Sequence, residues 1–215
     1  MRLLPGMPRT ADGAPAALPV FFEGACTEAL ATARARSIPL LIFLHSDLHE
    51  DADEFVCGVL ADAAVSAYMS ENFVVWGGSL QTSEGYAAAE LFGAAGYPFV
   101  GVYVPLATSS SQGTARAARA WTLEGGIGAL LALVSPSAPG AAVAAQGTMA
   151  GLGAAGSSTD VAAAAAKIFN AALRRVVSAV QPELDSVAAE RVARDADRSL
   201  RTEQVSQCSF GCYEP

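Results

Sequence analysis

Two kinds of side chain in this sequence could do chemistry: four thiols, and a polar cluster that follows an apolar run. The cysteines are Cys26, Cys57, Cys208 and Cys212, and none of them forms a Cys-x-x-Cys pair. A disulfide oxidoreductase needs a low-pKa thiolate near a helix N-terminus, with a resolving thiol beside it. Cys57 is expected about two turns into a helix, and acidic neighbours there raise the pKa of a thiol. We therefore interpret Cys57 as a small core or half-buried residue.

The polar cluster comprises His45, Asp47, His49, Asp51 and Asp53. Two histidines with a carboxylate could bind zinc. Their spacing falls across a loop and does not follow one helix face, so our interpretation is a polar loop with acidic residues at a helix start. The sequence predicts no metal site, no cofactor and no catalytic residue.

The remaining sites for chemistry are weaker still. Cys208 and Cys212 could pair or bind metal, but the sequence places no further ligand near them. The sparse use of cysteine is typical of a reducing compartment. The stretch GGSLQTSEG lacks the lysine of a phosphate-binding loop. With two histidines in the chain, no Ser-His-Asp triad is supported.

Composition excludes further classes of function. The 215 residues carry a formal net charge of -8, whereas binding to nucleic acid needs a basic surface. No apolar run approaches the roughly 20 residues of a membrane-spanning helix. The nearest, residues 141–156, is interrupted by glycine and is typical of a low-complexity linker. Prolines interrupt the N-terminal stretch, so we expect no signal or transit peptide.

Helices and strands alternate along the first two thirds of the chain. A six-residue apolar run from Pro39 to Leu44 predicts a strand that is buried on both faces. Alternating elements indicate parallel βαβ units, and two final strands indicate a hairpin. The expected elements are a helix capped by Thr27, a strand in 39–46, a helix over 51–70, a strand in 72–78, a helix capped by Ser83 and ending at Gly93, a strand over 99–104 with Pro98 at its front, a turn at 106–114 and an antiparallel strand in 115–126.

The rest of the chain is predicted to be helical after an interruption. Residues 1–18 are expected to be disordered, as is an Ala/Gly-rich insertion at 135–159. A helix is predicted over 160–180, and a charged helix over 181–204 is followed by an irregular tail at 205–215. Glu190 can pair with Arg194, and Arg191 with Asp195, along one face of the charged helix. That helix is either a solvated helix or a coiled-coil connector.

The segment from Phe21 to Pro105 resembles the UAS domain of the FAS-associated factor and UBX-domain protein family. The resemblance continues through Glu124-Gly125 and resumes at residues 190–204, so apart from the insertion it spans roughly 19 to 204. The matching positions, in order, are Phe22, Gly24, Ala29-Leu30, Leu44-His45-Ser46, Asp53-Glu54-Phe55, Asn72-Phe73, Trp76, Glu84-Gly85-Tyr86 and Tyr97-Pro98-Phe99.

This resemblance implies an α/β, thioredoxin-like fold without redox activity. A mixed four- to five-stranded sheet flanked by helices would occupy residues 19–134, residues 160–180 would supply its final helix, and the charged helix would follow. Pro98 matches the proline that is cis in thioredoxin-like folds. Structural roles are expected for the matched residues His45, Ser46, Asp53, Phe55, Trp76 and Tyr97.

The resemblance also implies a function. The closest family members are adaptors that link ubiquitylated cargo to the valosin-containing AAA ATPase, often in endoplasmic-reticulum-associated degradation. Their UAS domain is credited with binding long-chain unsaturated fatty acids. We therefore expect a non-catalytic adaptor module in the cytoplasm, at the cytosolic face of the endoplasmic reticulum. The alternatives are a fatty-acid-sensing module that self-associates and a thiol redox or metal enzyme.

The sequence departs from the family pattern in three ways. No ubiquitin-binding UBA domain and no hydrophobic hairpin precede the UAS-like segment, so ubiquitin binding and membrane anchoring are not carried over. The pattern changes after Gln204, where the family continues into a UBX domain, and direct docking to the ATPase is therefore not expected. Val56 stands where the family often has a cysteine, and Cys57 follows one position later.

Overall fold

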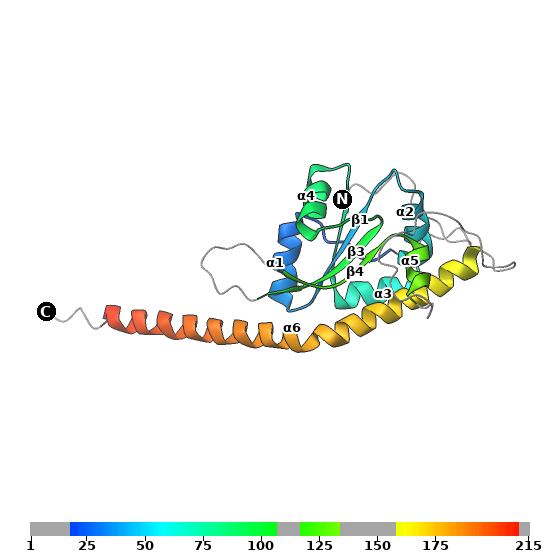
Figure 1. Cartoon of the computed structure of the whole chain (residues 1–215). Helices are drawn as coiled ribbons and strands as arrows, with labels where there is room; N and C mark the ends of the chain where they lie inside the picture. Colours follow the sequence, from blue (N-terminus) through cyan, green and yellow to red (C-terminus); the bar gives the residue numbers. More distant parts are fainter. Residues whose placement is uncertain (1–17, 107–116, 134–157, 211–215) are drawn as a thin grey trace.

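The computed structural model describes residues 18–106, 117–133 and 158–210 (Figure 1). The predicted turn at 106–114, apart from its first residue, and most of the predicted disordered segments lie outside these ranges. In chain order the elements are α1 (Cys26–Arg36), β1 (Leu40–His45), α2 (Glu50–Phe55), the π-helix η1 (Val56–Leu60), α3 (Ala63–Asn72), β2 (Val74–Ser79), α4 (Ser83–Phe92), β3 (Phe99–Pro105), β4 (Ala117–Glu124), α5 (Ile127–Ala132) and α6 (Ser158–Phe210).

The four strands form one mixed sheet in the order β2-β1-β3-β4. Strand β1 pairs in parallel with β2, and β3 runs antiparallel to both β1 and β4. A parallel βαβ unit joined to an antiparallel hairpin is the thioredoxin-like arrangement, so the predicted fold class is confirmed. The peptide bond between Tyr97 and Pro98, just before β3, is cis.

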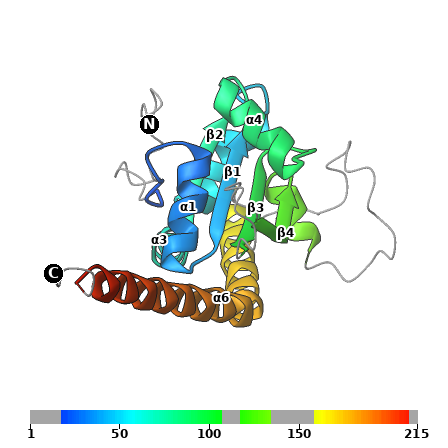
Figure 2. The ribbon, with the colours of Figure 1, turned by 90° about the vertical axis from the view of Figure 1, so that its left-hand side faces the viewer.

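Strand β1 lies at the centre of two hydrophobic cores. Leu41 and Phe43 pack into the core on one face of the sheet, whereas Leu40, Ile42 and Leu44 pack into the core on the other face. This alternation follows from the two-residue period of a strand. Helices α1 and α4 cover one face, and α2, η1, α3, α5 and the first half of α6 cover the other (Figure 2).

The helix predicted over residues 51–70 is in fact three segments, so that prediction was wrong. After α2 the chain forms the π-helix η1, in which Ala61 N–H donates to Val56 O at 3.0 Å. A new helix, α3, then begins at Ala63. Its N-cap is Asp62, whose Oδ1 accepts the N–H groups of Ala64 and Val65, both at 3.0 Å. The aspartate satisfies backbone donors at a helix start and so fixes the break.

The predicted N-caps of the first and third expected helices, Thr27 and Ser83, were also wrong. Helix α1 begins one residue before Thr27, and the N–H of Cys26 donates to Glu84 Oε1 at 2.8 Å. Helix α4 is capped by Thr82 and not by Ser83, because Thr82 Oγ1 accepts the N–H of Gly85 at 3.0 Å. Tyr86 of α4 is 57% exposed.

Helix α6 continues through Pro182, where two separate helices were expected. The helix changes direction near this point (Figure 1), as a proline inside a helix causes when its ring displaces the preceding turn. Leu184, beyond the proline, packs with Val104 of β3, so tertiary contact holds the helix against the domain. The helix extends to Phe210, past Gln204, where an irregular tail was expected. Helix α5 was not predicted.

The charged half of α6 carries ion pairs along its own surface. Glu190 pairs with Arg194, as predicted. Arg191 instead donates to the carbonyl of Ala35 at the end of α1, and Asp195 lies 3.8 Å from Arg198. Within the described residues, no helix combines the length and the apolarity needed to cross a bilayer.

We predict that Gly85→Ala lowers the free energy of unfolding by more than about 3 kcal/mol. A Cβ at this position would lie 2.0 Å from the backbone oxygen of Ser79, so β2 and α4 would have to separate. Gly128→Ala is the matched control, because a Cβ there meets nothing within 4 Å. Alanine in helix α5 should be neutral or stabilising by up to about 1 kcal/mol. Urea unfolding followed by circular dichroism measures both, and equal effects would contradict the prediction.

A second prediction concerns Ser37, which ends α1 with a left-handed backbone at φ 54°. Its N–H donates to Arg34 O at 3.2 Å, and glycine tolerates this geometry without steric cost. Ser37→Gly should therefore stabilise the fold by roughly 0.5–1 kcal/mol. The hydroxyl of Ser37 is buried and has no hydrogen-bond partner among the described residues, so Ser37→Ala serves as the control that removes only this group. If both variants gain equally in urea unfolding, the backbone explanation is wrong.

Candidate functional site

The corner where β1 passes into α2 is the position at which a redox enzyme of this fold would carry its thiols. In this chain the corner holds His45 and Ser46. The ring of His45 is half-buried and stacks on Phe43 with centroids 5.9 Å apart. Its Nδ1 lies 3.2 Å from Asp47 Oδ1. Ser46 Oγ accepts the N–H of Leu48 at 3.4 Å, so the polar groups of the corner fix the loop itself.

The other members of the predicted polar cluster do not converge on a common point. His49 Nδ1 and Asp51 Oδ2 are 3.9 Å apart, and both side chains are about half exposed. Asp53 points to solvent. Within residues 18–106, 117–133 and 158–210, no three His, Cys, Asp or Glu side chains are placed to share a metal ion.

Cys57 lies on η1 and is exposed, so the prediction of a core or half-buried residue was wrong. The π turn accounts for this, because its wider spacing directs Phe55, Val59 and Leu60 into the core and leaves Cys57 outside. Partial burial, and then the carboxylate of Asp53, raise the pKa of the Cys57 thiol. A raised pKa leaves little thiolate at neutral pH, which is the opposite of what a redox nucleophile needs.

Cys26 begins α1 on the opposite face of the sheet and is 7% exposed. A thiol at a helix N-terminus usually has a lowered pKa. Here burial, and then the carboxylate of Glu84, raise the pKa of Cys26 to about 12. Because Cys26 and Cys57 belong to different faces of the sheet, neither can act as the resolving thiol of the other. The side chains of Cys208 and Cys212 lie outside the described part of the structure.

Three of the remaining matched residues have structural contacts. Phe55 stacks on Phe43 at 6.2 Å and meets Phe169 of α6 edge-on at 5.7 Å, so it joins β1 to the last helix. Trp76 is buried, and its Nε1 donates to Gly24 O at 3.0 Å. The hydroxyl of Tyr97 donates to Ala94 O at 3.5 Å. Burial, and then Glu124 and Tyr86, raise the pKa of Tyr97.

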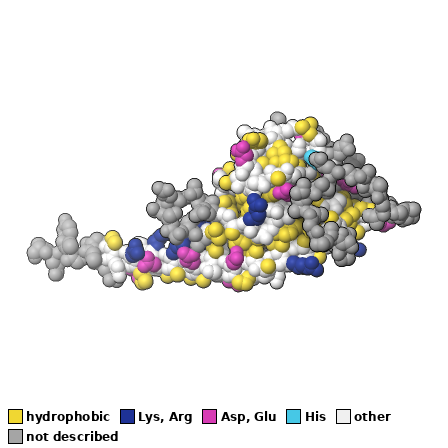
Figure 3. Space-filling view, in the orientation of Figure 1, with side chains coloured by type: hydrophobic (Ala, Val, Ile, Leu, Met, Phe, Trp, Pro, Cys, Tyr) yellow, Lys and Arg dark blue, Asp and Glu magenta, His cyan; other side chains and the backbone are white. Residues whose placement is uncertain are grey.

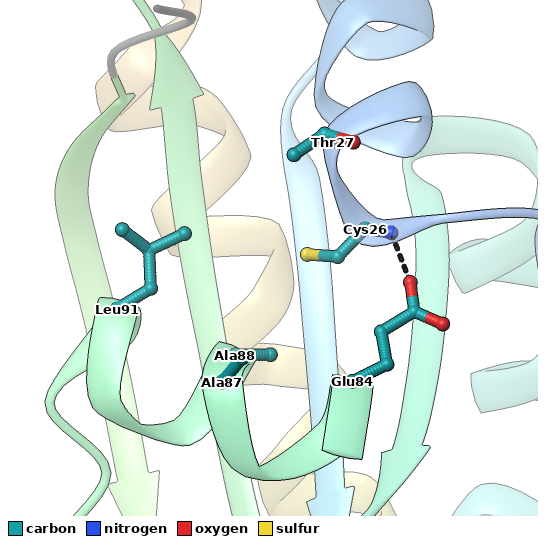
Figure 4. A pocket seen from close by; sticks show the side chains of 6 residues that line it. All are labelled: Cys26, Thr27, Glu84, Ala87, Ala88 and Leu91. Atoms are coloured by element: carbon teal, nitrogen blue, oxygen red, sulfur yellow. Dashed lines mark hydrogen bonds between the residues drawn. The ribbon is translucent and has the colours of Figure 1, made fainter. Parts of the chain in front are cut away.

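A pocket of about 280 Å³ lies between the start of α1 and the exposed face of α4. The sulfur of Cys26 and the side chain of Leu91 are turned toward the same space (Figure 4). Its walls are mostly apolar, and Glu84 is the one charged residue among them. The lining residues are Cys26, Thr27, Glu84, Ala87, Ala88 and Leu91.

Sequence reasoning missed this pocket. Its two walls are about 60 residues apart in the chain, and no periodicity within either helix connects them. The available signal was the pair Glu84-Gly85, because a glycine that early in a helix indicates close approach to another backbone. On the surface near α4, acidic and hydrophobic side chains lie next to each other (Figure 3).

We predict that Cys57 reacts slowly with iodoacetamide and that Asp53→Asn speeds the reaction. Removing the carboxylate lowers the pKa of the thiol toward its ordinary value, so more thiolate is present at neutral pH. The pH profile should move to lower pH by the same change. Glu54→Gln, one position further along α2, is the matched control. Peptide-resolved mass spectrometry gives the rate at Cys57 alone, and an unchanged rate in Asp53→Asn would contradict the electrostatic account.

Comparisons with known proteins place these features among relatives. No family model matches the chain. Plant UBX domain-containing protein 10 of Arabidopsis thaliana is 40% identical over 80 residues, which is 37% of this chain and 17% of that protein. FAS-associated factor 2 is 33% identical over 82 residues in Rattus norvegicus and in Homo sapiens. These alignments cover 38% of this chain and 24% or 18% of the relative. The chain thus spans less than two thirds of each relative's length.

Among solved structures, a thioredoxin from Thermus thermophilus is 27% identical, with a TM-score of 0.42, over 51% of this chain and 76% of that one. A disulphide isomerase from Xylella fastidiosa is 18% identical, with a TM-score of 0.37, over 70% and 97%. The fold assignment rests on the strand order and pairing described above. Over about 80 residues the chain is similar to FAS-associated factor 2 and to a plant UBX-domain protein, and this similarity together with the thioredoxin-like fold supports a UAS-type module.

Proposed function

We propose that this chain is a non-catalytic adaptor module of the ubiquitin and AAA-ATPase protein-degradation pathway, acting in endoplasmic-reticulum-associated degradation at the cytosolic face of that membrane. The observation that carries the non-catalytic part is the strand-to-helix corner. It holds His45, Ser46 and Asp47 where a redox enzyme of this fold would hold two thiols. The pathway part is taken from the homology to FAS-associated factor 2 and UBX-domain proteins.

The state of the thiols supports the absence of redox catalysis. Thiol–disulfide exchange needs a thiolate and a second sulfur within reach. The pKa of Cys57 and that of Cys26 are both raised, and the sheet separates the two residues. Among the described side chains, neither cysteine therefore has a second sulfur within reach, and the raised pKa of each disfavours its thiolate.

The pocket favours a protein partner over a fatty acid. A long-chain fatty acid carries its own carboxylate, and the charged group in the pocket wall is Glu84, so the two negative charges would repel. The volume of about 280 Å³ also lies just below the range of about 300–1,000 Å³ that is usual for small-molecule sites. A pocket of this size suits one apolar side chain better than a long acyl chain.

We predict that the purified chain does not accelerate the reduction of insulin disulfides by dithiothreitol. The reason is the missing thiolate pair at the corner. The assay is the turbidity of precipitating insulin, and a thioredoxin provides the positive control. Cys57→Ser should give the same baseline as the unmodified chain. Turnover that disappears in Cys57→Ser would overturn the proposal.

The pathway part is tested by quantitative mass spectrometry of proteins that co-precipitate with the tagged chain. FAS-associated factor 2 serves as the reference bait. We expect enrichment of ubiquitin-pathway proteins, with weak recovery of the AAA ATPase at most. Failure to enrich any pathway component shared with the reference bait would remove this part, while the insulin result would still stand.

A further inference from the structure

We propose that the pocket between α1 and α4 is a docking site for a peptide segment of a partner protein, in which one bulky aliphatic side chain inserts and an adjacent Lys or Arg pairs with Glu84. The inference deepens the proposed adaptor function and rests on it, because it names the chemistry of a segment that the module would bind.

Helix α4 presents one continuous stripe to the pocket. Glu84, Ala87, Ala88 and Leu91 follow the i, i+3, i+4, i+7 spacing of a single helix face. Leu91 is 68% exposed at the rim, although removing a leucine side chain from water is energetically favourable. Alanines line the space beside it, so an inserted side chain meets aliphatic walls and the sulfur of Cys26 (Figure 4).

The charges around the pocket specify the sign of the partner. The segments 21–33 and 80–95 form the walls and their surroundings, and they contain no Lys or Arg. They contain four glutamates, all exposed: Glu23, Glu28, Glu84 and Glu90. The next cation along α1 is Arg34. At the far end of α4, Arg119 of β4 donates to Phe92 O. Complementarity therefore selects a basic segment.

Glu84 is held in place for this role. Its Oε1 accepts the N–H of Cys26 at 2.8 Å, which links the first turn of α4 to the first residue of α1. The carboxylate is nonetheless exposed, and its second oxygen is turned away from the bonded N–H (Figure 4). A cation of the bound segment can therefore approach Glu84 without breaking the contact between the helices.

The test is a titration of the full ¹⁵N-labelled chain with the synthetic peptide Gly-Ser-Lys-Leu-Lys-Ser-Gly, followed by NMR. We expect amide shifts at Cys26, Thr27, Glu84 and Leu91, and weaker binding as salt is raised. A peptide with Glu in place of both Lys, and one with Ala in place of Leu, should leave these amides unmoved. No shifts up to about 5 mM peptide, or shifts confined to other elements, would overturn the proposal.

Variants of the chain assign the effect to the pocket. Leu91→Ala removes an exposed side chain and should weaken binding about tenfold. Glu84→Gln keeps an oxygen acceptor for the N–H of Cys26 but removes the charge, and should abolish the preference for the basic peptide. Leu133→Ala is the matched control, because Leu133 is 58% exposed at the end of α5. Equal weakening by Leu91→Ala and Leu133→Ala would contradict the assignment.

Oleate is titrated in parallel below its micellar concentration. If oleate moves the pocket amides and the basic peptide does not, the pocket takes a lipid and the proposal fails. The insulin assay on the same sample separates the two levels of inference. If the peptide causes no amide shifts and the chain does not accelerate insulin reduction, only the docking-site proposal is wrong. If the chain accelerates insulin reduction, the proposed function is wrong as well.

Discussion

The structure depends on one strand that has no solvent-facing side. The five apolar residues of β1 from Leu40 to Leu44 are each at most 4% exposed. They supply alternate side chains to two cores, and burying each large aliphatic or aromatic side chain contributes about 1.5–3 kcal/mol. Parallel pairing with β2 and antiparallel pairing with β3 then follow from the same strand. Because β1 is paired with a strand on each side, the position of its C-terminal end, where the corner begins, is also fixed.

That endpoint is the corner at which a redox enzyme of this fold would carry its thiols. The scaffold still delivers the chain from a buried strand to a helix start, and the Tyr97–Pro98 peptide before β3 is cis. The reactive groups are what differ. His45 pairs with Asp47 at the corner, and the two described thiols lie elsewhere with raised pKa values. At Cys26 burial, and then the carboxylate of Glu84, raise the pKa of the thiol although the residue begins a helix.

The sheet could be predicted from the sequence because its signals are local. The apolar run after Pro39 indicated β1, and Pro98 marked the front of β3. The helical segments were harder, because their limits depend on contacts between distant residues. Asp62 is the N-cap of α3, although the apolar spacing over residues 51–70 indicated one continuous helix. Pro182, a normal stop signal, lies within α6 because Val180 and Leu184 pack on Val104 from both sides of it. The pocket could not be predicted, since Glu84 meets Cys26 only after the chain has folded.

The same long-range bonds give the pocket a fixed shape. At one end of α4, Glu84 accepts the N–H of the first residue of α1. The backbones of β2 and α4 also pack closely there, because a Cβ added at Gly78 would lie only 3.2 Å from Gly85 Cα. At the other end, the carbonyl of Phe92 accepts two donors, Tyr103 Oη–H at 3.1 Å and Arg119 Nη2–H at 2.7 Å. Charged and hydroxyl donors at a helix C-terminus satisfy carbonyls that the helix itself leaves free. With α4 held at both ends, the pocket is formed without a partner, so binding of the proposed segment would add little ordering cost on the side of the protein.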